Sequence, residues 1–72
     1  MMLKISLKAA RVNVGLSQKD VAKQLGISNK TLSSWENGDT FPSAKYIDEL
    51  CRLYNVVYDD IIFLPSDSLK GN

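Results

Sequence analysis

The feature that most constrains the fold is a local pattern that occurs twice within residues 17–38: a serine, a short amphipathic segment and then a glycine. Ser17 and Ser28 are predicted helix N-caps, because a serine hydroxyl can accept a hydrogen bond from a free N–H of the first turn. Gly26 and Gly38 are predicted stops, since glycine adopts the left-handed conformation that ends many helices. The pattern therefore predicts two short helices joined by a tight turn.

Similar signals predict further helices on both sides of this pair. Ser6 is a predicted N-cap for a helix that ends before Gly15, and Ser43 for a helix whose apolar residues recur at helical spacing. A short fifth helix is predicted around residues 58–63, ending before Pro65. No stretch alternates convincingly between apolar and polar residues. The predicted fold class is therefore all-α.

The length of 72 residues allows one domain. We expect a compact five-helix domain over residues 1–65 and a flexible polar tail over residues 66–72. Cys51 is the only cysteine and histidine is absent, so neither a disulfide nor the usual kind of zinc site is expected. The sequence shows no signal peptide or membrane span, which favours a cytoplasmic protein. No cofactor or small-molecule ligand is evident.

The helix predicted after Ser28 has two chemically distinct faces. Successive residues are rotated by ~100°, so Leu32 and Trp35 point to one side, which we expect to be the core. The opposite side carries a cation, hydroxyls and amides without a carboxylate, from Asn29, Lys30, Ser33, Ser34 and Asn37. Amides can pair with adenine edges and lysine with guanine, although polar residues are also ordinary on a solvent-exposed face. The joint pattern favours a DNA-reading surface in a helix-turn-helix arrangement.

The charge is strongly polarised along the chain. Residues 1–34 contain six Lys or Arg and one Asp, whereas residues 35–72 contain three Lys or Arg and seven Asp or Glu. A molecule of this kind can turn its basic side to a polyanion. The simpler alternative is that the acidic residues are only solvated helix surface.

These residues together resemble the phage repressor/Cro family of helix-turn-helix regulators, also called the Xre type. The resemblance covers roughly residues 5–64. It is carried by Arg11, Gly15-Leu16-Ser17-Gln18, Val21-Ala22, Leu25-Gly26, Ser28, Leu32, Trp35-Glu36-Asn37-Gly38, Pro42 and the segment from Val56 to Ile61. It implies a lambda-repressor-like domain that binds double-stranded DNA.

The resemblance also implies roles for individual residues. Ser28, Asn29, Lys30 and Ser34 occupy groove-facing positions, and helical rotation adds Ser33 to these base-reading candidates. The implied phosphate contacts are Gln18, at the start of its helix, and Asn37, with Ser17 and Lys45 as weaker candidates. Arg11 and Glu36 are implied to form an internal ion pair, which we expect to be partly buried. The simpler alternative is an exposed ion pair that contributes ~0–1 kcal/mol to stability.

Two departures from the family pattern have physical consequences. Val57 stands where a capping Ser or Thr is usual, and a missing cap costs about 1 kcal/mol. Asp59 and Asp60 offset part of that loss through the helix dipole. Asp39 is acidic where a basic residue is common, which should weaken the contact of this loop with DNA phosphate or tilt the domain on the DNA.

Other conspicuous side chains have simpler interpretations. Trp35 and Cys51 are expected to be packing residues rather than a base-stacking platform and a redox sensor. The tyrosines are expected to pack while their hydroxyls contact water. Four consecutive apolar residues cannot all be buried by one short helix, so part of the run Ile61, Ile62, Phe63 and Leu64 is a candidate dimer interface. A homodimer would place two recognition helices roughly 34 Å apart on a near-palindromic site.

Three classes of function are compared. The favoured class is a transcriptional regulator of the Cro/C1 repressor type, from a phage, a prophage or a bacterial host. The alternative is a protein-binding module, such as an antitoxin or adaptor, that holds a partner protein with the same fold. An enzyme is disfavoured, because histidine is absent and no serine lies beside a plausible base.

Overall fold

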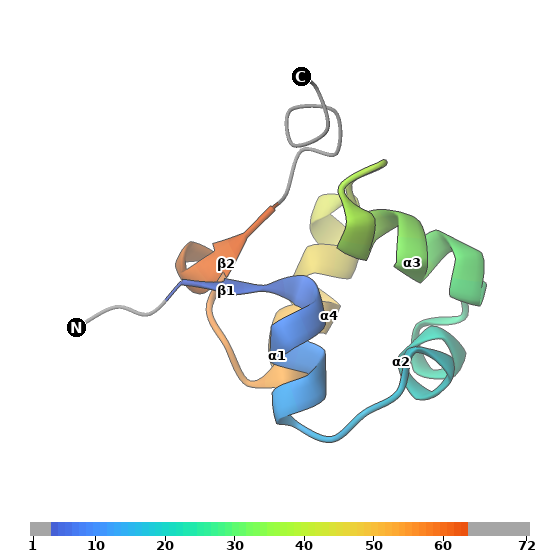
Figure 1. The fold of residues 1–72 in the computed structure, drawn as a ribbon, viewed down its shortest axis with the longest axis horizontal. Helices are drawn as coiled ribbons and strands as arrows, with labels where there is room; N and C mark the ends of the chain where they lie inside the picture. The colour runs from blue at the N-terminus through green and yellow to red at the C-terminus, as the bar shows by residue number, and fades with distance from the viewer. Residues whose placement is uncertain (1–3, 64–72) are drawn as a thin grey trace.

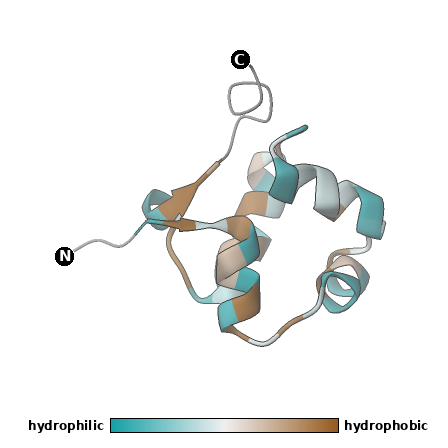
Figure 2. Cartoon of the chain, in the orientation of Figure 1, coloured by the Kyte–Doolittle hydropathy of each residue, from teal (hydrophilic) through white to brown (hydrophobic). Residues whose placement is uncertain are grey.

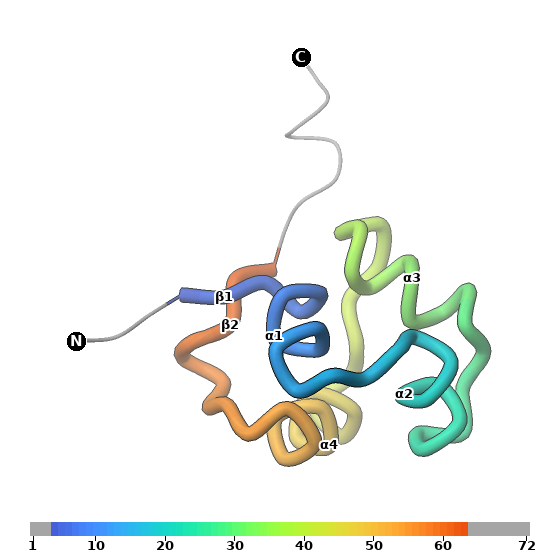
Figure 3. The backbone as a smooth tube through the Cα atoms, turned by 60° about the horizontal axis from the view of Figure 1, so that its bottom comes forward, coloured from blue at the N-terminus to red at the C-terminus, as the bar shows by residue number. Residues whose placement is uncertain are grey.

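The computed structural model describes residues 4–63, which form α-helices at the centre and two very short strands at the chain ends (Figure 1). In chain order the elements are β1 (Ile5–Ser6), α1 (Leu7–Asn13), α2 (Gln18–Leu25), α3 (Asn29–Asn37), α4 (Ala44–Tyr54), the 3-10 helix η1 (Tyr58–Asp60) and β2 (Ile61–Ile62). Figures 1 and 3 both place α2 and α3 on one side of α1 and the two strands on the other side.

The C-terminal end departs from the expected five-helix, all-α architecture. The described residues contain four α-helices, and the expected fifth helix is a 3-10 helix of three residues followed by a strand. β2 pairs with β1 in parallel, with Ile61 opposite Ile5 and Ile62 opposite Ser6. The physical reason is that β-branched side chains favour extended backbone. A strand also points consecutive side chains to opposite faces, which buries Ile61 and exposes Ile62.

All four α-helices and β2 contribute to one core. Its buried members are Leu7, Ala10, Val21, Leu32, Trp35, Leu50, Tyr54 and Ile61. Figure 2 shows hydrophilic residues over much of α2 and at both ends of α3, whereas β2 and the start of β1 are hydrophobic. The core therefore supports the α2–α3 pair from behind and leaves its outer side polar.

Candidate nucleic-acid interface

Side-chain hydrogen bonds set the starts of α2 and α3. Ser17 Oγ accepts a hydrogen bond from the Asp20 N–H at 3.0 Å, and the Asp20 carboxylate accepts one from the Ser17 N–H at 3.1 Å. Ser28 Oγ accepts one from the Thr31 N–H at 3.1 Å. Gly26, at a φ of 73°, ends α2 in the left-handed conformation. Local chemistry therefore defines both helices and the turn between them.

The inner sides of α2 and α3 pack closely. Val21 and Leu32 are fully buried, and Trp35 is 7% exposed. Ala22 is buried as well, and its small side chain allows the two helices to approach each other. Trp35 also lies against the ring of Tyr46 on α4, with 5.4 Å between ring centroids. The predicted core position of Trp35 agrees with this packing, which holds α3 rigidly from behind.

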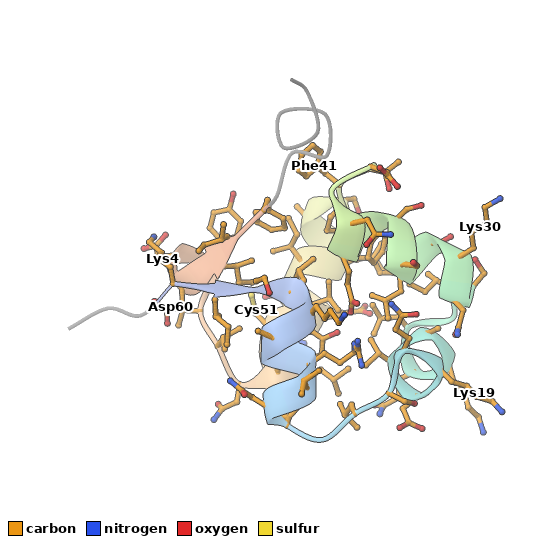
Figure 4. All side chains as sticks on the ribbon, in the orientation of Figure 1. Lys4, Lys19, Lys30, Phe41, Cys51 and Asp60 are labelled. Atoms are coloured by element: carbon orange, nitrogen blue, oxygen red, sulfur yellow. The ribbon has the colours of Figure 1, made fainter. Side chains whose placement is uncertain are left out.

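The outer side of α3 is polar and accessible. Asn29, Lys30 and Asn37 are exposed, while Ser33 and Ser34 are half-buried. Figure 4 shows Lys30 projecting away from the body of the molecule at the start of α3. Within α3 the outer side carries no carboxylate, because the one acidic residue of the helix, Glu36, is buried.

Two of the predicted DNA-reading hydroxyls already have partners within the chain. Besides capping the helix, Ser28 Oγ lies 3.0 Å from Thr31 Oγ1. Ser33 Oγ accepts a long hydrogen bond of 3.5 Å from Asn37 Nδ2. These contacts orient the hydroxyls and leave Asn29 and Lys30 as the side chains of this face with the greatest freedom to reach a ligand.

Arg11 on α1 and Glu36 on α3 form a buried ion pair. Arg11 Nε lies 2.7 Å from Glu36 Oε2, and Arg11 Nη2 donates to Glu36 Oε1 at 3.2 Å. Arg11 Nη1 also donates to the Leu16 carbonyl at 2.9 Å, so the guanidinium holds the α1–α2 connection just before the N-cap of α2. The hydrogen bond to Glu36 raises the pKa of Arg11. Both residues are only 8% exposed, so the pair is more deeply buried than the sequence suggested.

Gln18 joins the same network. Its Nε2 donates to Glu36 Oε1 at 2.9 Å, and its side chain is half-buried. The resemblance implied that Gln18 contacts the DNA backbone. The structure adds that Glu36 orients the Gln18 carboxamide in the free protein. One carboxylate therefore links α1, α2 and α3.

The remaining phosphate candidates lie at helix starts. Ser17 is exposed, but its hydroxyl is engaged in the capping box described above. Lys45 is exposed near the start of α4, with its ammonium 5.4 Å from the centre of the Tyr46 ring. Ser43, the predicted cap of α4, occupies the N-cap position, but the described residues show no hydrogen bond from its side chain.

The predicted dimer residues separate into different environments. Ile61 is 8% exposed and belongs to the core, so its side chain offers almost no surface to a second molecule. Ile62 is 40% exposed, and Phe63 is half-buried. Leu64 lies outside the described residues. The alternation follows from the extended backbone of β2, which the helical prediction did not anticipate.

Sequence reasoning missed a group of exposed apolar side chains near this end. Phe41, Val57 and Tyr58 are each more than half exposed. Phe63 connects two of them, with ring centroids 6.1 Å from Phe41 and 6.0 Å from Tyr58. Exposed apolar patches often mark interaction sites. The available signal was the concentration of apolar residues from Val56 onward, of which only the run from Ile61 to Leu64 was predicted to be an interface.

Two tyrosines also differ from expectation. Tyr54 is fully buried, and among residues 4–63 its hydroxyl has no hydrogen-bond partner. Burial raises the pKa of Tyr54, and the nearby charge of Glu36 raises it further. Tyr58, expected to be a packing residue, is largely exposed.

Within the part of the chain that the structure describes, no helix has the length and apolarity needed to cross a membrane.

Comparison with known proteins places this geometry in a family. Residues 7–61 match the family model described as "Helix-turn-helix". The chain is 34% identical over 65 residues to an uncharacterised HTH-type transcriptional regulator of Methanocaldococcus jannaschii, a match that covers 90% of this chain and 98% of that protein. It is also 37% identical over 65 residues to the HTH-type transcriptional regulator ImmR of Bacillus subtilis, covering 90% of this chain and 51% of ImmR.

Another similar protein carries a different description. The antitoxin PezA of Streptococcus pneumoniae is 39% identical over 57 residues, which is 79% of this chain and 36% of PezA. The chain thus spans about a third of PezA and about half of ImmR. The family match, in contrast, includes every element from α1 to η1. With its capped α2–α3 pair and its match to HTH-type transcriptional regulators, this chain belongs to the Xre-like helix-turn-helix family.

Proposed function

We propose that this chain is a sequence-specific regulator of transcription, of the Cro/C1 repressor type, that inserts α3 into the major groove of double-stranded DNA. The observation that carries the proposal is the outer side of α3, which is polar, carries no carboxylate and is held rigidly by Leu32 and Trp35. A helix fits the major groove, where each base pair presents a distinct pattern of donors and acceptors. The names of the similar regulators support the same conclusion.

Base reading is assigned to the side chains that the outer side of α3 presents. Asn29 and Lys30 are exposed, and Ser28, Ser33 and Ser34 provide hydroxyls that can donate to or accept from base edges. Asn37 at the end of α3, with Gln18, Ser17 and Lys45 at helix starts, supplies contacts to phosphate. Glu36 assists indirectly, because its hydrogen bond orients the Gln18 side chain.

A homodimer is part of the proposal. One helix reads only a few base pairs, which is too little to select a single site in a genome. Two copies related by a two-fold axis would read two half-sites about one helical turn apart. The regulator would act in the cytoplasm and repress by occupying a near-palindromic operator.

The direct test is selection of bound duplexes from a random library at moderate salt. We expect a site of two inverted half-sites whose centres lie about 10 base pairs apart. Binding should weaken steeply with salt, because phosphate contacts release counterions. Failure to enrich any sequence, with binding that persists at high salt, would contradict the proposal.

A second function is favoured by two observations. The chain is similar to part of PezA, which is named an antitoxin, and its surface carries exposed apolar side chains at Phe41, Val57 and Tyr58. The chain would then hold a partner protein, and that complex would persist as salt rises, because apolar contacts are not screened. Salt dependence therefore separates the two functions.

A further inference from the structure

An open groove runs beside α4 on the side that faces η1. Its volume is about 700 Å³, and α4, the connection at residues 55–57 and the start of η1 line it. Figures 1 and 3 place η1 across the molecule from α2, with α1 and α4 between them. A molecule bound in this groove would therefore leave the outer sides of α2 and α3 free.

The α4 wall of the groove has the spacing of a helix-packing surface. Its residues recur at the spacing of one helix face, and they are Ala44, Ile47, Asp48, Cys51 and Arg52. This spacing gives a continuous stripe along one face of a helix. The small side chains of Ala44 and Cys51 leave room for another backbone to approach, and Ile47 adds apolar surface between them.

The apolar surface continues beyond the groove. Val57 and Tyr58 form part of its wall and are 60% and 57% exposed. Tyr58 contacts Phe63, and Phe63 contacts Phe41 in the loop after α3. The exposed surface therefore extends from α4 to the loop that follows the proposed DNA-reading helix.

Charge distinguishes the possible occupants of the groove. Asp48 and Arg52 lie one turn apart on its α4 wall and pair with each other at 2.6 Å while both are largely exposed. In an antiparallel pair of α4 helices, Asp48 of each copy would face Arg52 of the other copy. The surface is therefore complementary to itself about a two-fold axis.

We propose that the α4 face lining this groove packs against the same α4 face of a second copy of the chain, in an antiparallel two-fold arrangement. The association is driven by burial of apolar and small side chains, which are Ala44, Ile47, Cys51, Val57 and Tyr58. The ion pairs between Asp48 of one copy and Arg52 of the other fix the register of the two helices. The inference rests on the dimeric function proposed above. It moves the predicted interface from Ile61, Ile62, Phe63 and Leu64 to α4 and the start of η1.

The test uses charge reversal in the full chain without DNA. Asp48→Arg and Arg52→Asp each place like charges opposite each other in a homodimer, so each variant should dimerise about tenfold more weakly in sedimentation equilibrium. An equimolar mixture of the two variants should recover wild-type dimerisation as a heterodimer, because both exchanged pairs become opposite in sign. Lys23→Glu, on α2, is the matched control and should leave dimerisation unchanged.

Cys51 provides an independent reporter, because it is the only cysteine and lines the groove. Its rate of modification by a maleimide should fall several-fold as the protein concentration rises through the dimerisation range. In Asp48→Arg the rate should stay high over the same range. Fast labelling in a wild-type dimer would place the interface elsewhere and overturn the inference.

The remaining outcomes separate this inference from the proposed function. A dimer that resists both charge reversals but dissociates in Ile62→Asp would overturn the α4 groove and leave the dimeric regulator intact. A chain that stays monomeric at all concentrations, with Cys51 slow to react throughout, would show that other residues of the same chain cover the groove. Selection of an operator by such a monomer would still support DNA reading by α3.

Discussion

The segment of residues 17–38 and the segment of residues 55–63 reach their structures by different routes. The first is defined by hydrogen bonds between residues three positions apart, at Ser17 and at Ser28. The second begins at an N-cap, Val57, with no side-chain hydrogen bond among the described residues, and it is completed by pairing with β1 at the other end of the chain. Local chemistry therefore determines the segment proposed to face DNA, whereas distant contacts determine the structure of the C-terminal segment.

The largest effect should follow from breaking the ion pair that joins the first segment to α1. Glu36→Ala leaves the buried Arg11 guanidinium unpaired and removes the partner of Gln18. Loss of one member of a buried pair costs about 3–5 kcal/mol, a large part of the roughly 4–10 kcal/mol expected for the domain. Thermal unfolding should show a fall in Tm of more than about 10 °C. Arg52→Gln, which breaks an exposed pair, is the control and should change Tm little at a protein concentration where the chain is monomeric.

Adjacent residues in β2 test the second segment. Ile61 is buried and Ile62 is 40% exposed. Ile61→Ala should destabilise by on the order of 2–4 kcal/mol, because it opens a cavity in the core, whereas Ile62→Ala should stay within about 0.5 kcal/mol. Denaturant unfolding at low protein concentration measures both. Equal losses at the two positions would contradict the strand.

The functional side of the comparison is tested at Lys30. Lys30→Ala should weaken binding to the selected operator by about 1–3 kcal/mol and relax the preference at one base pair. Titration of the matched and single-mismatch duplexes gives both quantities, with Lys8→Ala on α1 as the control. An equal loss on every sequence would show that Lys30 only neutralises phosphate.

Ser28 and Ser43 are both N-cap residues, so comparing them tests how much a side-chain cap contributes to stability. Ser28 caps α3 through its side chain, whereas the described residues show no such bond at Ser43, the N-cap of α4. Ser28→Ala should cost about 1 kcal/mol, and Ser43→Ala should cost much less. Chemical denaturation gives the free energy of unfolding of both variants. A larger loss of stability in Ser43→Ala than in Ser28→Ala would contradict this prediction.

The smallest effect concerns pH. The hydrogen bond from the Ser17 N–H, with help from the Ser17 hydroxyl, lowers the pKa of Asp20 below its usual 3.8. A lowered carboxyl pKa in the folded state stabilises the protein above pH 3.8, and that contribution is lost as pH falls through the lowered value. Asp20→Asn should therefore flatten the loss of stability between about pH 4 and pH 2. The carboxyl signal of Asp20 in an NMR titration checks the cause, and identical pH slopes in the two proteins would exclude it.

The sequence predicted best what neighbouring residues decide. The caps at Ser17 and Ser28 and the left-handed stops at Gly26 and Gly38 require only a few residues of context, and the structure shows all four. The inward position of Trp35 follows from helical rotation in the same way. The family was also identified from these residues, and the match to residues 7–61 agrees.

What the sequence did not predict depends on distant partners. The pairing of Ile61 with Ile5 joins residues from opposite ends of the described chain, and a run of apolar residues gives no signal for it. The depth at which Arg11 and Glu36 are buried depends on how α1 meets α3. The exposure of Phe41 and Tyr58 likewise depends on how the loop after α3 lies beside the chain end. The proposed base-reading roles stay predictions until an operator is known.

The parallel pairing of β1 with β2 has a consequence for synthesis of the chain. β1 is the first of the described elements to leave the ribosome, but its partner is the last. A nascent chain that has already emerged through α3 can form its capped helices, while Ile5 and the core beneath β2 still lack the cover that Ile61 provides. The capped turns of the helices proposed to bind DNA can therefore begin to form before the domain is closed, but helices of 8 and 9 residues gain full stability only when the rest of the core packs against them.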